Sequence, residues 1–282
     1  MFAAILSTIF GAGGMILDKL TLTRHKVNLG VFLPVGFLLV FLMTLVLVPF
    51  FGRVDWQIAL LPNSLFLLFL MVVIAIAWNV FLYQSIQHEK IHHHELIMML
   101  GPIITVVLAA IFYPEEYDAR IFYLALIASL ALIFSKSQKE HFFTGKVSYN
   151  TFLGVVLMST EAVVIRELLY SYTPVALYAI RTLVITIFFL FYYRPDVRKV
   201  TPQAWGLIGF SAFFGLIQML ARFYAYSELG LTYTTLISIL GPIIIFLASW
   251  EILHEKIRPR VIFAALVILI CVIIATVISF GS

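Results

Sequence analysis

The residues that first suggest chemistry are histidines near position 90. His88, Glu89 and His92 fit the pattern H-E-x-x-H, and His94 follows two positions later. On a helix, this spacing puts two imidazoles on one face beside a carboxylate, which is the arrangement of a zinc hydrolase. Two other interpretations are metal binding or pH sensing without catalysis, and a water-facing connection between helices.

Three ionisable residues lie within long apolar runs: Glu161, Arg181 and Arg222. A charge at the centre of a bilayer costs about 2.5–3.5 kcal/mol, so such a side chain faces a cavity or a partner. Glu161 and Arg181 could form a structural ion pair, or Glu161 could bind a substrate or a coupling proton. A third alternative is an uncharged Glu161 without a role. Arg222 could line a cavity or extend toward lipid headgroups from near its helix end.

Polar and aromatic residues at helical spacing indicate a hydrated face around these charges. Together with the three charged residues they complete the set of candidate substrate or coupling residues: Trp78, Asn79 and Tyr83 in one apolar run, Tyr178 in a second, and Gln218 and Tyr226 in a third.

The elements that hold these residues are membrane spans. The chain has 282 residues, of which 63% are hydrophobic and 11% charged, whereas soluble domains have about 25% charged residues. A span needs about 20 apolar residues. Ten runs qualify: 1–17, 29–51, 63–83, 94–113, 119–135, 149–170, 174–193, 204–226, 232–250 and 259–280.

The two halves of the chain repeat one another. "LIMMLGPII" at 96–104 matches "LISILGPII" at 236–244 in seven of nine positions. An odd number of spans in each half makes the second half cross the membrane in the opposite sense. The sequence therefore predicts an all-α membrane protein of ten helices in two inverted five-helix repeats, at 1–135 and 149–282, joined by a linker at 136–148.

These residues resemble the EamA-like branch of the drug/metabolite transporter superfamily. The resemblance rests on a Gly-Pro in the fourth helix of each half, on a glutamate beyond it, and on "FYAYSELGLTYTTLISILGPIIIFLASWEILHEKI" at 223–257. "PVALYAIRTLV" at 174–184 is similar to the family's seventh helix, where an arginine is common. The second helix, "NLGVFLPVGFLLV", departs from the pattern because it has no arginine matching Arg181.

The Gly-Pro pairs are Gly101-Pro102 and Gly241-Pro242, each about midway along its predicted span. Proline removes a backbone donor and predicts a kink there. Glu115 and Glu255 occupy matched helix ends in the repeat. We expect each to accept hydrogen bonds from the first turn of the next helix, as a structural cap.

The repeat also tests the zinc hypothesis. The segment that matches the histidine run in the second half, "ELGLTYTTL" at 228–236, contains no histidine. A metalloprotease also needs a third ligand from another span. The pattern therefore favours a water-facing connection, with no resident metal or cofactor.

The resemblance implies a transporter that moves a small, amino-acid-like or amphipathic solute across the cytoplasmic membrane by alternating access. The sequence contains no G-x-x-x-x-G-K-[ST] motif, so we expect coupling to an ion gradient or exchange. The expected partners are the solute and the bilayer, without nucleic acid, in a monomer or weak homodimer. The alternatives are a membrane zinc enzyme and a receptor or assembly protein on the same fold.

Two arguments on orientation disagree. Lysine and arginine gather in connections after odd-numbered spans, such as Lys19, Arg24 and Lys26 after the first. The positive-inside rule then places both termini outside. The family resemblance places both termini inside.

Overall fold

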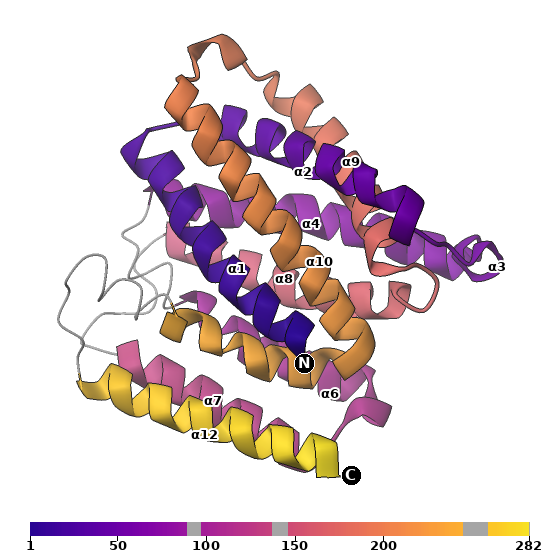
Figure 1. The fold of residues 1–282 in the computed structure, drawn as a ribbon, viewed down its shortest axis with the longest axis vertical. Helices are drawn as coiled ribbons and strands as arrows, with labels where there is room; N and C mark the ends of the chain where they lie inside the picture. The colour runs from indigo at the N-terminus through magenta and orange to yellow at the C-terminus, as the bar shows by residue number, and fades with distance from the viewer. Residues whose placement is uncertain (89–96, 137–145, 245–258, 282) are drawn as a thin grey trace.

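A computed structural model describes residues 1–88, 97–136, 146–244 and 259–281, and it is a bundle of long helices (Figure 1). In chain order the elements are α1 (Phe2–Lys19), the π-helical turn η1 (Leu20–Arg24), α2 (Leu29–Phe51), α3 (Trp56–Ala59), α4 (Pro62–His88), α6 (Gly101–Phe112), the 3₁₀ turn η2 (Pro114–Glu116), α7 (Ala119–Lys136), α8 (Lys146–Leu168), α9 (Pro174–Tyr193), the 3₁₀ turn η3 (Val197–Lys199), α10 (Pro202–Ser238) and α12 (Pro259–Gly281). Within the described residues, extended pairing is limited to one bridge between Val54 and Tyr172.

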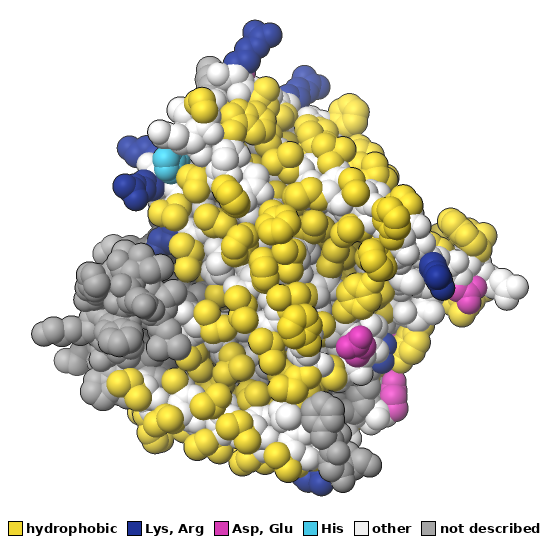
Figure 2. Space-filling model, viewed as in Figure 1, with side chains coloured by type: hydrophobic (Ala, Val, Ile, Leu, Met, Phe, Trp, Pro, Cys, Tyr) yellow, Lys and Arg dark blue, Asp and Glu magenta, His cyan; other side chains and the backbone are white. Residues whose placement is uncertain are grey.

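The outer surface of the bundle is that of a membrane protein. Five stretches are long and apolar enough to cross a bilayer: Phe2–Leu22, Leu29–Phe51, Pro62–Ser85, Pro174–Tyr193 and Pro202–Ile244. Figure 2 shows a face that is mostly apolar, with lysine and arginine near its edges. Large side chains such as Phe69 and Phe191 are 69% and 76% exposed. A helix satisfies its own backbone hydrogen bonds, so such a surface is stable in lipid.

The helices pack in four main pairs. α1 lies along α10, α4 along α8, α2 along α9, and α7 along α12 (Figure 1). Each pair joins one helix from the first half of the chain to one from the second. In the predicted repeat, α1 corresponds to α8 and α4 corresponds to α10. The α1–α10 pair and the α8–α4 pair are therefore equivalent in that repeat. The inverted relation of the halves and the domain boundaries remain predictions.

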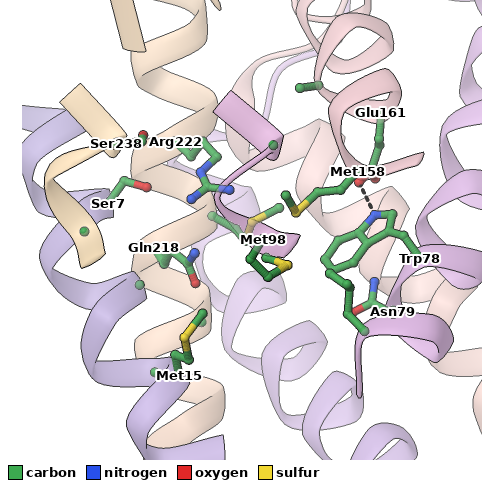
Figure 3. Close-up of a pocket in the computed structure, with 18 of the residues that line it drawn as sticks. Ser7, Met15, Trp78, Asn79, Met98, Met158, Glu161, Gln218, Arg222 and Ser238 are labelled. Carbon is green, nitrogen blue, oxygen red and sulfur yellow. Dashed lines mark hydrogen bonds between the residues drawn. The ribbon is translucent and has the colours of Figure 1, made fainter. Parts of the chain in front are cut away.

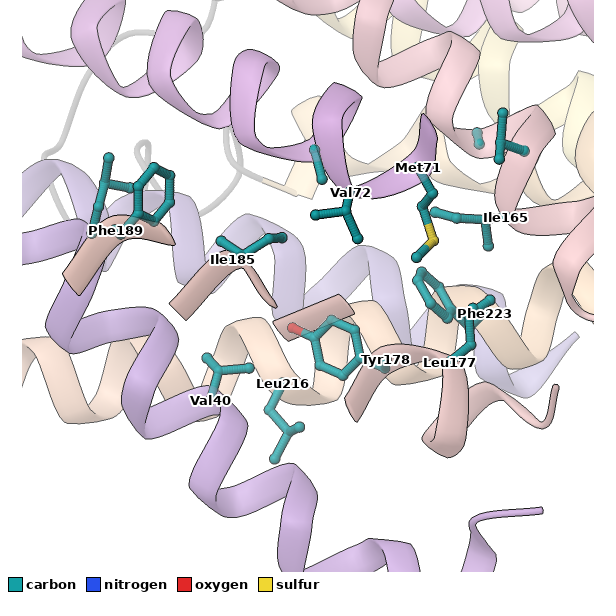
Figure 4. Close-up of a cluster of buried hydrophobic side chains, with 14 of the residues drawn as sticks. Val40, Met71, Val72, Ile165, Leu177, Tyr178, Ile185, Phe189, Leu216 and Phe223 are labelled. Atoms are coloured by element: carbon teal, nitrogen blue, oxygen red, sulfur yellow. The ribbon is translucent and has the colours of Figure 1, made fainter. Parts of the chain in front are cut away.

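A buried apolar cluster fixes the orientation of α9 (Figure 4). It joins Met71 of α4, Leu177 and Ile185 of α9, and Phe223 of α10, all of them 0% exposed. The ring of Tyr178 meets that of Phe223 edge to face at 5.6 Å. Because these side chains interlock, the face of α9 that carries Arg181 is turned into the bundle.

The first helix is longer than the sequence predicts. The predicted span ends at residue 17, but α1 reaches Lys19 and continues as a π-helical turn to Arg24. Thr21 supports this turn by donating from Oγ1 to the carbonyl of Leu17 at 2.7 Å. Asp18 therefore lies inside the helix. The hydropathy-based prediction ended the span early because hydropathy treats a carboxylate as exposed. It takes no account of hydrogen-bond partners that other helices can supply.

The predicted spans at 204–226 and 232–250 are joined through one long element with a break. Gly230 interrupts α10 with φ 75° and ψ 176°. A residue with a Cβ rarely adopts this conformation, so glycine is required for the chain to pass between the two segments in this way. Residues 245–250 of the ninth predicted span lie outside the described residues.

The Gly-Pro pairs mark helix starts, which corrects the predicted mid-span kink. A turn at residues 99–100 precedes α6, and Gly101 and Pro102 are its first two residues. A second turn at Ile239 lies two residues before Gly241. Proline suits the first turn of a helix because its missing N–H would have no intrahelical partner there.

Candidate functional site

A cavity of about 370 Å³ lies in the centre of the bundle. We refer to it as the central cavity. All nine predicted substrate or coupling residues line it: Trp78, Asn79, Tyr83, Glu161, Tyr178, Arg181, Gln218, Arg222 and Tyr226. Gly101, Pro102, Gly241 and Pro242 line it as well. They come from α4, α6, α8, α9, α10 and the segment that follows α10.

Glu161 and Arg181 form a closed ion pair on one wall of the cavity. Arg181 donates from Nε to Glu161 Oε1 at 2.6 Å and from Nη2 to Oε2 at 3.2 Å. Both side chains are 2% exposed. Trp78 donates from Nε1 to Glu161 Oε2 at 2.5 Å (Figure 3). The Arg181 guanidinium lies 5.8 Å from the Trp78 ring centre, within range of a cation–π contact.

A second carboxylate, Asp18 of α1, also lines the cavity, and the sequence-based prediction missed it. Tyr83 of α4 donates its hydroxyl to Asp18 Oδ2 at 3.0 Å. Ser211 of α10 donates a short hydrogen bond to Oδ1. No lysine, arginine or histidine in the described part of the chain forms an ion pair with Asp18.

A signal for Asp18 was present in the sequence. Gly11, Met15 and Asp18 match Gly154, Met158 and Glu161 when the two stretches are aligned 143 residues apart. The offset of 140 fits the fourth helices, and connections of different length change the offset elsewhere. Asp18 thus occupies in α1 the position that Glu161 occupies in α8.

Counting from the starts of the next helices, α9 and α2, gives a reason why only one of the two carboxylates has an arginine. Arg181 is the eighth residue of α9, and Gly36 is the eighth residue of α2. Both line the central cavity. A Cβ placed on Gly36 would have no heavy atom within 4 Å. The position that holds a guanidinium in the second half is therefore open space in the first.

Arg222 lies on the opposite wall from the ion pair. Figure 3 shows Arg222, Gln218 and Ser7 on one side of the cavity, with Met98 and Met158 between them and Trp78. The Nε of Arg222 is buried and has no hydrogen-bond partner within the described structure. The hydroxyl of Ser7, a fully buried residue, also lacks a partner there. A buried donor without a partner is costly, so these groups are suited to a bound acceptor.

Helix breaks bring backbone groups to the same region. Gly101 starts α6 at the cavity, with no side-chain cap on the helix. Ser159 of α8 donates to the Gly101 carbonyl at 3.2 Å.

Three other predicted residues line the cavity and also make contacts within the bundle. Asn79 donates to the Ala75 carbonyl at 2.8 Å, while Tyr178 and Tyr226 are buried against the core.

Comparison with known proteins identifies the fold and the family. The model of the EamA-like transporter family matches residues 148–277. This match identifies residues 148–277, the second half of the chain, as EamA-like. The EamA-like family is part of the drug/metabolite transporter superfamily, and its members are transporters.

The whole chain shares the fold of a solved structure. A protein of known crystal structure is similar over 98% of this chain and 95% of its own length, with a TM-score of 0.74 and 13% identity. At this identity the similarity shows the fold alone. No curated protein matches the EamA-like chain in sequence.

Most of the predicted histidine site lies outside the described residues. His88 ends α4, and His92 and His94 lie outside the described residues. The described residues contain no group of three or more histidine, cysteine, aspartate or glutamate side chains placed to hold a metal.

The predicted cap at Glu115 is wrong. Glu115 is exposed in η2 and caps no helix. Asp118, directly before α7, accepts from the backbone N–H of Arg120 at 2.8 Å and pairs with its guanidinium. These bonds lower the pKa of Asp118. Asp118 caps α7 because its carboxylate is adjacent to the first free N–H groups of that helix. Glu255 lies outside the described residues.

Proposed function

We propose that this EamA-like transporter moves a small amphipathic solute, which carries an anionic or other hydrogen-bond-accepting group, through the central cavity by alternating access. The observation that carries the proposal is Arg222, whose buried Nε has no hydrogen-bond partner among the described residues. A guanidinium presents several donors in a planar fork that matches a carboxylate. Ser7 adds a second free donor on the same wall.

The rest of the cavity suits the apolar part of such a solute. Met15, Met98 and Met158 line it together with Trp78 and Phe32. Methionine adapts its shape to different apolar groups. A volume of about 370 Å³ falls within the usual range of about 300–1,000 Å³ for small-molecule sites.

The proposed mechanism uses the two halves as units that move against each other. In this proposal residues 1–135 and 149–282 form inverted five-helix repeats, ten spans in all, in the cytoplasmic membrane. The cavity lies where the halves meet, which is where inverted-repeat transporters bind their solutes. The Glu161–Arg181 pair joins α8 to α9 within the second half, so it can persist while the halves move. We propose that a monomer or weak homodimer is the working form, driven by an ion gradient or by exchange.

A binding screen over several classes of solute tests the proposal. Purified protein in detergent is melted with a panel of amphipathic amino acids, organic acids and neutral analogues. A ligand at about 100 times its Kd stabilises the folded state by about 2.7 kcal/mol. We expect stabilisation by panel members that carry an anionic group.

Two variants make the screen specific. Arg222→Gln should fold and lose the stabilisation. Arg198→Gln, a matched change at an exposed arginine in η3, should keep it. A hit is then tested for flux in proteoliposomes. Stabilisation that survives in Arg222→Gln, or binding without flux, would contradict the proposed role.

A further inference from the structure

The two carboxylates of the central cavity have partners of different chemical kinds. Arg181 and the Trp78 indole N–H, which hold Glu161, can only donate hydrogen bonds. A protonated Glu161 would lose one acceptor and place its own proton against donors. Tyr83 and Ser211, which hold Asp18, are hydroxyls that donate or accept. The Asp18 site therefore satisfies its hydrogen bonds in both charge states, and the Glu161 site does so only when ionised.

We propose that Asp18 is the exchangeable-proton site of the cavity and that Glu161 stays ionised as a structural partner of Arg181. This inference rests on the proposed transport function and names the ion that the transporter couples. Asp18 lines the cavity and forms no ion pair with the residues that the structure describes. Gly36, the α2 position that corresponds to Arg181, also lines the cavity, and it carries no charge.

The proton step is balanced within the site. An incoming proton forms an O–H bond on Asp18 Oδ1 and converts the carboxylate to a carboxylic acid. That O–H then donates to Ser211 Oγ, which had been the donor. The Ser211 hydroxyl turns its own proton toward the carbonyl one turn back in α10, as serine does in helices. The reverse sequence releases the proton.

None of the other charged or titratable groups, among the described residues that line the cavity, forms an ion pair with Asp18. Tyr83 of α4 is its direct partner. Tyr178 and Arg181 of α9 lie close enough to interact with Tyr83 electrostatically, but Arg181 is paired with Glu161 of α8. Arg222 of α10 lies 11 positions after Ser211, or about 16 Å along the helix at 1.5 Å per residue. Gly36 and Phe37, which α2 places at the cavity, do not titrate.

Infrared difference spectroscopy tests the assignment without any solute. A pH step from about 8 to about 4, which spans the range of carboxyl groups, should add a carboxylic C=O band from a buried site. We expect Asp18→Asn to remove this band. We expect it to persist in Asp118→Asn, a control that lies outside the cavity and is 30% exposed, and in the double variant Glu161→Gln/Arg181→Gln, which removes both charges of the pair.

A second variant keeps the test valid if Asp18→Asn does not fold. Ser211→Ala retains the carboxyl group but removes one hydrogen bond, so it should shift the frequency of the band. Absence of the band in the unmodified protein, or its survival in Asp18→Asn, would overturn the proposal. These outcomes do not depend on solute binding, so they are distinct from failure of the Arg222 screen.

Discussion

Asp18 and Glu161 occupy matching positions in two similar helices and line the same cavity, yet they are held differently. Glu161 has a bidentate arginine and an indole N–H, whereas Asp18 has two hydroxyls. The difference traces to one position, where α9 has Arg181 and α2 has Gly36. In our proposal, this difference gives one carboxylate a structural role and leaves the other available for proton exchange.

The largest effect is expected from breaking the pair at Glu161. Glu161→Gln leaves Arg181 buried without a counter-charge, which should lower the free energy of unfolding by about 3–5 kcal/mol. Denaturant unfolding of the protein in detergent measures the loss. The double variant Glu161→Gln/Arg181→Gln should recover much of it, because no lone charge remains. A loss below about 1 kcal/mol in the single variant would mean that the pair is not structural.

The comparison can be sharpened by giving Asp18 the arginine that Glu161 has. Gly36→Arg places a guanidinium where a Cβ has room. If Gly36 is the counterpart of Arg181, the new side chain pairs with Asp18 and keeps it ionised. The infrared band assigned to Asp18 should then be absent across the pH step, with the fold intact by circular dichroism. Gly206→Arg, at an open position on α10 outside the cavity, is the control and should retain the band.

A smaller effect is expected from neutralising Asp18. Asn at this position still accepts from Tyr83 or Ser211, and no buried cation is left alone. Asp18→Asn should therefore change the free energy of unfolding by about 1 kcal/mol, measured as for Glu161→Gln. A loss as large as that of Glu161→Gln would show that the two carboxylates are equally structural and would remove the contrast between them.

The smallest effect is expected away from both carboxylates. Replacing His88 and His92 with Ala should change stability by about 0.5 kcal/mol or less and leave solute-dependent stabilisation unchanged. Metal analysis of the purified protein should give the same zinc content before and after the change. Loss of bound zinc together with loss of activity would instead favour the enzyme hypothesis.

Sequence reasoning succeeded where a local rule controls the result. Apolar runs of sufficient length locate helices such as α2, and its start at Leu29 and end at Phe51 match the prediction. Helical spacing placed Gln218, Arg222 and Tyr226 on one face, and all three line the cavity. Sequence reasoning failed at the end of α1. Hydropathy assigns Asp18 to a connection because it takes no account of Tyr83 and Ser211, which are distant in sequence and close in the fold.

By itself, the sequence determined that this is a helical membrane protein and that Glu161 and Arg181 needed partners inside the bilayer. Composition, run length and the cost of burying a charge are sufficient for those conclusions. Only the tertiary structure decided which groups meet: that Trp78 joins Glu161, that Asp18 faces the cavity, and that Arg222 keeps a free donor. Those contacts join different helices, and how each helix is rotated about its axis is set by packing with its neighbours.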